Sequence, residues 1–137
     1  MAARDVPGVR HRRRARCPGW FELFTRDFAG ALEFYRSVFH WKTEIEGDTD
    51  EFRYATLRDA DTDDQRAGVM DASAFLPEGV PAHWSVYWQV DDVDATADRV
   101  KVLGGAVVDG PTDTPYGRMA TVTDPSGAMF KLRTPPS

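Results

Sequence analysis

The chain has 137 residues, which is enough for one domain that buries about two thirds of its unfolded surface and too few for two ordinary domains. Hydrophobic residues make up 42% of it and charged residues 28%, and no apolar run approaches the roughly 20 residues that a membrane-spanning helix needs. This composition excludes a disordered chain and predicts no membrane partner, and the net charge of -5 argues against nucleic acid as a partner. Cys17 is the only cysteine, so no intrachain disulfide is possible, and we expect a cytoplasmic location.

Residues 1–18 differ in composition from the rest of the chain. Five arginines lie between positions 10 and 16, and no hydrophobic periodicity accompanies them. Because Cys17-Pro18-Gly19 follows this basic run in place of an apolar segment, the pattern is not that of a secretory signal. We expect residues 1–18 to form a disordered, solvated tail, with a basic arm for phosphate or an anionic surface as the alternative, and residues 19–134 to form a single domain.

A strand is predicted over residues 20–24, whose side chains alternate between two faces. Phe21 and Leu23 are expected to face a helix. The opposite face, where we expect a site, carries Trp20, Glu22 and Phe24. Asp27 then offers a side-chain oxygen to the first amide groups of a helix. Apolar residues at three- and four-residue spacing are expected on the buried side of that helix: Ala31, Leu32, Tyr35, Val38 and Phe39.

Three more strands are predicted after this helix, over residues 42–46, 51–58 and 67–70. Gly47-Asp48 marks the first turn between them, and the acidic stretch 59–64 forms the second connection. These elements complete a first module, residues 19–71. Residues 71–82 contain Pro77, Gly79 and Pro81 without any periodic pattern, so they are expected to connect two halves of the domain.

The same pattern then restarts in a second module, residues 83–134. A strand over residues 84–90 presents Ser85, Tyr87 and Gln89 on one face, and Asp91 or Asp92 caps a helix that ends at Gly104-Gly105. Trp20 lies seven residues before Asp27, as Ser85 lies seven before Asp92. Further strands are predicted over residues 106–109, 119–123 and 128–132. The sequence pattern therefore predicts an α+β fold of two βαβββ modules, and we expect their concave faces to close over one cavity.

Several short motifs in this order resemble those of the vicinal oxygen chelate superfamily, also called glyoxalase/bleomycin-resistance/dioxygenase-like proteins. The resemblance covers about residues 18–133. It rests on the strand-to-Asp-to-helix unit and on four short segments: Phe34-Tyr35, Val90-Asp91-Asp92-Val93-Asp94, Leu103-Gly104-Gly105 and Asp124-Pro125-Ser126-Gly127. It implies curved mixed sheets that pair into a glyoxalase-like half-barrel, and a homodimer, as in many relatives.

Enzymes of this superfamily hold a divalent metal through inward side chains on the first and last strands of each module. The resemblance puts Trp20, Ser85 and Lys131 at three of these positions, and the fourth falls within residues 66–70, which contain no carboxylate or histidine. Indole, a lone hydroxyl and an ammonium group cannot build such a site. We therefore expect no metal cofactor, with a divalent metal bound through His83 as the weaker alternative.

Glu22 and Lys131 are both predicted to point into the cavity, where an unpaired charge is costly. We expect one of two arrangements. Either Glu22 and Lys131 pair with each other, or Lys131 anchors an anionic ligand and Glu22 is a catalytic general base. Aromatic side chains on the same faces suit planar or amphipathic small molecules. The expected ligand-binding residues are Trp20, Glu22, Phe24, Ser85, Tyr87, Gln89 and Lys131.

The sequence thus predicts a family member that binds a small hydrophobic or aromatic molecule without the usual metal ligands. Two alternatives stay open at this point. One is a lyase, isomerase or dioxygenase-type enzyme that acts on a carbonyl or oxygenated substrate through Glu22 or a non-standard metal set. The other is an interaction module whose cavity is filled by its own side chains.

Overall fold

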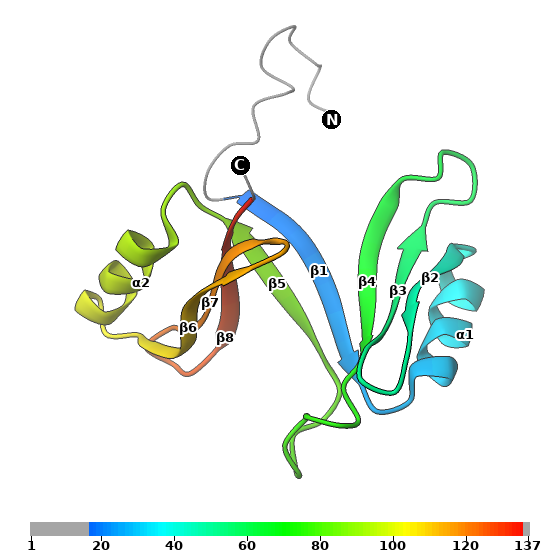
Figure 1. Ribbon diagram of the computed structural model, residues 1–137, viewed down its shortest axis with the longest axis horizontal. Coiled ribbons are helices and arrows are strands. Elements are labelled where there is room, and N and C mark those ends of the chain that lie inside the picture. The colour runs from blue at the N-terminus through cyan, green and yellow to red at the C-terminus, as the bar shows by residue number, and fades with distance from the viewer. Residues whose placement is uncertain (1–16, 136–137) are drawn as a thin grey trace, which may run out of the picture. The chain divides into compact units, whose positions relative to one another are not determined.

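The computed structural model describes residues 17–135, and its elements follow the predicted order (Figure 1). The first repeat consists of β1 (Cys17–Thr25), α1 (Phe28–Phe39), β2 (Lys42–Asp48), β3 (Arg53–Arg58) and β4 (Gln65–Asp71). The second consists of β5 (His83–Gln89), α2 (Val93–Val102), β6 (Ala106–Thr114), β7 (Gly117–Thr123) and β8 (Met129–Thr134). The predicted α+β class and the two βαβββ repeats are confirmed. The predicted basic tail lies, through residue 16, outside the described residues.

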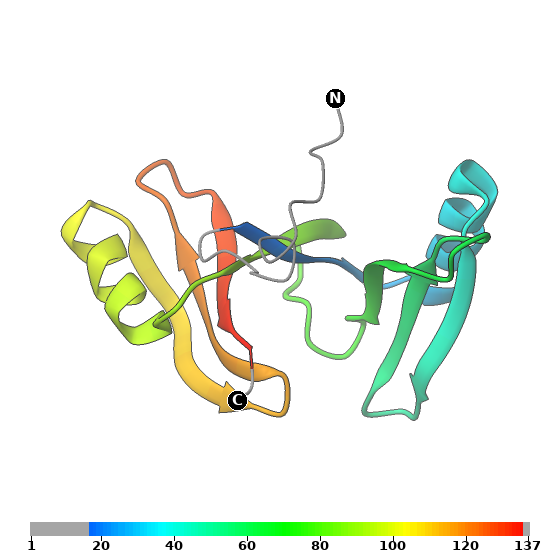
Figure 2. The same ribbon diagram turned by 90° about the horizontal axis from the view of Figure 1, so that it is seen from above.

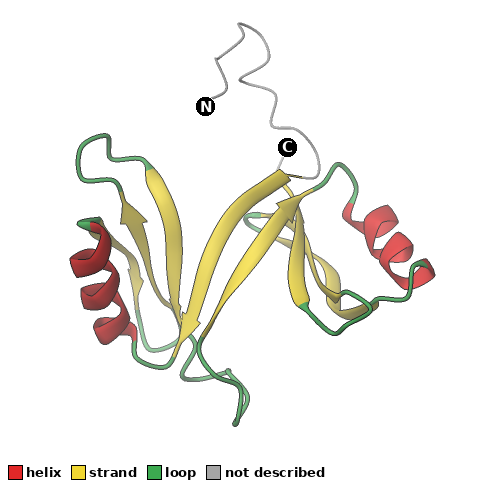
Figure 3. Ribbon diagram, turned by 180° about the vertical axis from the view of Figure 1, so that it is seen from behind, coloured by secondary structure: helices red, strands yellow, loops and turns green. Residues whose placement is uncertain are grey.

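The described chain forms two compact units. The N-terminal unit, residues 20–87, has the strand order β2-β3-β4-β1-β5, in which β1 and β4 are parallel and the β2–β3 and β3–β4 pairs are antiparallel. The C-terminal unit, residues 88–135 with 17–19, places the end of β5 beside β8, followed by β7 and β6 in antiparallel pairs. Each unit has one helix along its strands (Figure 3). Neither helix, within residues 17–135, is long and apolar enough to cross a membrane.

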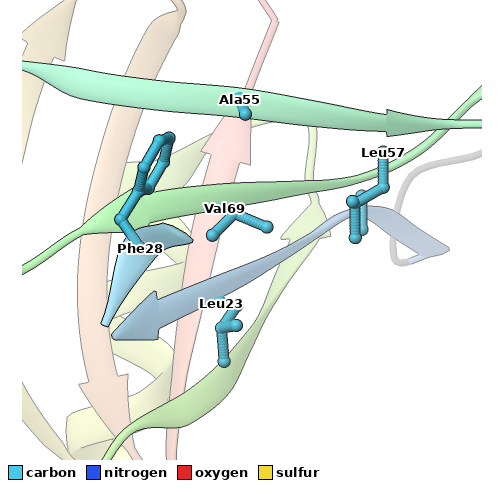
Figure 4. Close-up of a cluster of buried hydrophobic side chains, with 6 residues drawn as sticks. Leu23, Phe28, Ala55, Leu57 and Val69 are labelled. Carbon is cyan, nitrogen blue, oxygen red and sulfur yellow. The ribbon is translucent and has the colours of Figure 1, made fainter. Parts of the chain in front are cut away.

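The core of the N-terminal unit lies between α1 and one face of its strands. Figure 4 shows buried side chains of this core. Fully burying one such aliphatic side chain contributes about 1.5–3 kcal/mol. The cluster consists of Leu23, Phe28, Ala55, Leu57, Ala67 and Val69, with Ala31, Leu32 and Tyr35 of α1 packed against it. Since Leu23 faces this core, the alternation of β1 turns Glu22 and its same-face neighbours away from α1.

The buried side of α1 is shorter than its apolar pattern predicts. Val38 and Phe39 are 50% and 51% exposed, although both were expected to be buried. The periodic pattern continues to the end of the helix, but only its earlier turns reach the core cluster. The Phe39 ring instead stacks on Trp41, with centroids 4.4 Å apart, just after the left-handed residue His40.

Both helices begin at the aspartates that the sequence indicates. The Gly30 amide donates to the Asp27 carboxylate at 3.0 Å, and the Ala95 amide donates to the Asp92 carboxylate at the same distance. Asp92, rather than Asp91, is therefore the cap of α2. Gly104 follows α2 with a φ of +94°, which confirms the left-handed helix exit predicted there.

The connection between β4 and β5 is held by Arg26, just after β1. Its guanidinium donates to the carbonyl groups of Val80 and Pro77, each at 2.7 Å, and of Leu76 at 3.2 Å. Hydrogen bonds from a charged donor are stronger than neutral ones. Arg26 therefore anchors the long connection close to the start of β5, which carries part of the site described below.

The C-terminal unit repeats this arrangement around α2, which lies along one side of β6, β7 and β8 (Figure 2). Its core consists of Val90, Val93, Ala97, Ala120, Val122 and Leu132, with Val100, Val107 and Phe130 packed against it. Because Phe130 and Leu132 face α2, the alternation of β8 turns Lys131 and Arg133 to the opposite face.

The Asp27 cap provides a first prediction. Replacing Asp27 with alanine removes the acceptor for the Gly30 amide, so the free energy of unfolding should fall by about 1 kcal/mol. Asp27→Ser keeps a capping oxygen and should stay close to the original protein. Urea unfolding of the three proteins measures the difference, and equal stability of the alanine and serine variants would rule out the capping role.

Candidate functional site

Glu22 lies near the middle of β1, on the face turned away from α1, and is only 7% exposed. The Tyr54 hydroxyl of β3 donates to its Oε2 at 2.6 Å, and the Tyr87 hydroxyl of β5 donates to its Oε1 at 2.8 Å. The Trp20 indole N–H in turn donates to the Tyr54 hydroxyl oxygen at 3.0 Å. These four residues, all within the N-terminal unit, are called the Glu22 cluster below.

Gly68 of β4 creates the space in which this cluster forms. The parallel register places Gly68 beside Glu22, and the antiparallel register with β3 places it beside Thr56. A Cβ atom at Gly68 would lie 1.7 Å from the Tyr54 hydroxyl oxygen and 3.1 Å from the Trp20 indole nitrogen. The bare backbone of Gly68 therefore lets the tyrosine and the indole approach Glu22 across β4.

The hydrogen bonds of the cluster all point toward the carboxylate. Burying a carboxylate without partners is costly, and charge-assisted hydrogen bonds from hydroxyl groups compensate that cost. Each oxygen of Glu22 accepts a hydrogen bond from one tyrosine and has a second lone pair. The arrangement can thus hold the Glu22 side chain in a fixed orientation and still accept a hydrogen bond from a ligand.

Phe24 extends the same face toward the end of β1. Its ring stacks on the His83 imidazole with centroids 5.6 Å apart, and meets the Phe75 ring edge-on at 6.3 Å. His83 Nδ1–H donates to the Pro81 carbonyl at 2.9 Å. Aromatic and polar groups therefore alternate along this face from Trp20 to His83.

The structure brings some of the predicted site residues together and divides others between the two units. Trp20, Glu22 and Tyr87 share the Glu22 cluster, with Phe24 two residues beyond Glu22 on β1. Ser85 is buried on β5 in the same unit. Gln89 and Lys131 belong to the C-terminal unit. Gln89 is buried there, and Lys131 Nζ donates to the Thr121 hydroxyl at 3.2 Å.

Sequence reasoning missed Tyr54 and Gly68 as parts of the site. The alternation within β3 was a usable signal, because Ala55 and Leu57 face the core and so turn Tyr54 to the Glu22 face. Nothing in the sequence pairs Tyr54 with Glu22, since that contact depends on the register of β3, β4 and β1.

The residues present do not fit the divalent metal that the family resemblance implies. Within residues 17–135, no group of three or more His, Cys, Asp and Glu side chains is arranged to hold a metal ion. Trp20 supplies an N–H donor where a metal ligand would need a lone pair. The Asp71 carboxylate, at the end of β4, accepts from the Ser73 hydroxyl and amide, which lowers the pKa of its carboxyl group.

Sequence comparison finds the Glyoxalase/Bleomycin resistance protein/Dioxygenase superfamily over residues 18–132. The chain is 33% identical over 128 residues to an anthracycline biosynthesis protein of Streptomyces peucetius, covering 84% of this chain and 46% of the relative. It is 39% identical over 120 residues to a protein of Mycobacterium tuberculosis named as a glyoxylase, covering 85% of this chain and 43% of the relative. The chain thus spans less than half the length of these curated relatives.

Solved structures with the same fold include two methylmalonyl-CoA epimerases. The enzyme of Streptomyces coelicolor, in complex with 2-nitronate-propionyl-CoA, aligns with a TM-score of 0.60 at 21% identity, covering 90% of this chain and 99% of that one. The enzyme of Mycobacterium tuberculosis aligns with a TM-score of 0.60 at 19% identity, covering 94% and 96%. At these identities the likeness is one of fold.

The two tyrosines of the cluster should both stabilise the protein through their hydroxyl groups. Tyr54→Phe or Tyr87→Phe removes one donor from the buried Glu22 carboxylate, so each should lower the free energy of unfolding by about 1.5–3 kcal/mol. Tyr116→Phe, at a side chain that is 61% exposed, is the control and should change little. Urea unfolding measures all three, and losses no larger than that of the control would contradict the cluster.

Proposed function

Because the chain belongs to the Glyoxalase/Bleomycin resistance protein/Dioxygenase superfamily, we propose that it binds a small hydrophobic or aromatic molecule, without a metal ion, at the Glu22 cluster. The observation that carries this proposal is the Glu22 carboxylate held between two tyrosine hydroxyls, with Trp20 and Phe24 on the same strand face. Small-molecule sites typically combine apolar and aromatic walls with a few fixed polar groups.

The chemistry of this face favours a particular kind of ligand. Aromatic contacts contribute about 0.5–1.5 kcal/mol beyond their buried area, so Trp20 and Phe24 favour a flat, aromatic molecule. Glu22 offers lone pairs and negative charge, so the ligand should carry an O–H or N–H donor and no anionic group beside it. A hydroxylated aromatic compound meets both conditions.

Two comparisons support the proposal. The name of the Streptomyces peucetius relative places it in anthracycline biosynthesis, which makes anthracyclines a reasonable first ligand class to test. Structural neighbours have been solved with 2-nitronate-propionyl-CoA and with methylmalonyl-CoA, so the fold accepts small molecules in those proteins.

A second candidate function is proton transfer by Glu22, as in a lyase or isomerase. The burial of Glu22 and its fixed orientation favour it, because a general base must be held within hydrogen-bond reach of the proton it removes. Glu22 Oε1 or Oε2 would take the proton from a carbon next to a carbonyl group and return it to the same carbon. Incorporation of solvent deuterium into a carbonyl compound, lost in Glu22→Gln, distinguishes catalysis from binding alone.

The binding proposal predicts different outcomes for tryptophans on the two faces of the N-terminal unit. Titration calorimetry with an anthracycline should show saturable binding that Trp20→Ala weakens about 2- to 10-fold, through the lost aromatic contact. Trp84→Ala is the control, because Trp84 is on the opposite face of β5 from Tyr87 and donates to the Tyr35 hydroxyl of α1 at 3.0 Å. Equal losses in both variants would place the ligand elsewhere.

Glu22→Gln examines the polar half of the same proposal. It should weaken a hydroxylated aromatic ligand more than the matching compound without the hydroxyl group, because only the former donates to the carboxylate. Equal weakening of both compounds would show that Glu22 only supports the fold.

The cytoplasmic location and the homodimer remain predictions, and light scattering of the purified protein measures the latter.

A further inference from the structure

The C-terminal unit has a second polar face that the proposed function does not use. Val90 and Leu132 belong to its core beside α2, so alternation turns Gln89 and Arg133 to the face away from that helix. Lys131 lies on this face as well, next to Thr121 of β7. The helix α2 packs on the opposite side, where its Val93 and Ala97 share a core with Val90 and Leu132.

Gln89 and Arg133 are neighbours on adjacent strands. The Val90 amide donates to the Arg133 carbonyl at 3.0 Å, and the Thr134 hydroxyl donates to the Val90 carbonyl at 3.0 Å. These hydrogen bonds, through the amide and the carbonyl group of Val90, fix the register of the two neighbouring segments at this point. Since side chains at neighbouring positions of paired strands lie side by side, Gln89 and Arg133 share one patch of the face.

Both side chains have a buried polar atom without a partner. Gln89 is 7% exposed, and its Oε1 accepts no hydrogen bond within the described residues. The Nε–H of Arg133 is likewise buried and has no acceptor within residues 17–135. A buried polar group without a partner costs about 1–3 kcal/mol, and native proteins contain few of them. One acceptor and one cationic donor therefore lie beside each other, with their hydrogen-bonding capacity unused.

We propose that Gln89 and Arg133 form a binding site for a small carboxylate that carries a hydroxyl or amino group next to the carboxyl carbon. The carboxylate accepts from the Arg133 guanidinium, whose planar set of donors matches two carboxylate oxygens. The neighbouring O–H or N–H of the ligand donates to Gln89 Oε1. Lys131 adds positive charge two residues away on the same strand face.

The amide oxygen of Gln89 is what selects this ligand class. An anion without a donor, such as acetate or propionate, satisfies Arg133 but leaves Gln89 Oε1 unpaired and close to a second acceptor. Leaving a buried acceptor unpaired reduces affinity, whereas a 2-hydroxy carboxylate forms hydrogen bonds with Arg133 and with Gln89 at the same time. The site therefore distinguishes lactate from propionate by one hydroxyl group.

Heteronuclear NMR with the full chain measures this selection, with lactate, propionate and inorganic phosphate as probes. Lactate should shift the backbone amide signals of β5 and β8 in a saturable way and bind at least 3-fold more tightly than propionate. Arg133→Met should weaken both carboxylates at least 10-fold. Gln89→Met should abolish the preference for lactate and leave propionate unchanged.

Two further variants make the result specific. Arg99→Met changes an exposed arginine on α2 and should leave both affinities unchanged. Glu22→Gln should also bind lactate normally, since this site uses no residue of the Glu22 cluster; the two proposals therefore fail independently. The amide spectra of all variants report whether they fold.

Three results would overturn the carboxylate site. The first is the absence of saturable shifts with lactate. The second is equal binding of lactate, propionate and phosphate, which would indicate general attraction of anions to positive charge. The third is a direct Gln89–Arg133 hydrogen bond in solution, seen as equal losses of stability in Gln89→Met, Arg133→Met and the double variant.

Discussion

The arrangement of the N-terminal unit depends on one constraint, which is the need of a buried carboxylate for hydrogen-bond donors. Glu22 is in the middle of β1 and almost fully covered, so its two oxygens must be satisfied by groups that the neighbouring strands provide. Tyr54 reaches it from β3 and Tyr87 from β5. A single acidic side chain thereby links three strands that are far apart in the sequence.

This link depends on the absence of a side chain at Gly68. The strand β4 runs between β1 and β3, and any side chain of Gly68 would occupy the position of the Tyr54 hydroxyl. The same opening admits the Trp20 indole, which donates to that hydroxyl and orients it toward the carboxylate. At the position where the family resemblance puts a metal ligand, the chain has an indole that takes part in a hydrogen-bond relay.

The sequence was sufficient for those features that depend on neighbouring residues in the chain. The helix caps at Asp27 and Asp92 and the core position of Leu23 on β1 follow from local spacing, and the structure confirms them, whereas Phe21, expected on the same face as Leu23, is 44% exposed and lies outside the core cluster. The role of Tyr54 was not predictable in this way, because it depends on the register of β3, β4 and β1 and on a glycine in the middle strand, Gly68 of β4. Local periodicity also overestimated the buried length of α1, because Val38 and Phe39 continue its apolar spacing and yet are half exposed.

The internal repeat explains how one backbone can present two kinds of chemistry. Counting from the capping aspartates, Glu22 corresponds to Tyr87 and Phe24 corresponds to Gln89. In the N-terminal unit the positions on the face turned away from α1 supply an acceptor with aromatic side chains beside it, whereas β5 and β8 in the C-terminal unit supply an amide beside cationic groups. Equivalent backbone positions fix where a side chain points but not what it binds. The fold is therefore shared by distant relatives, whereas the ligand must be inferred from the side chains of each chain.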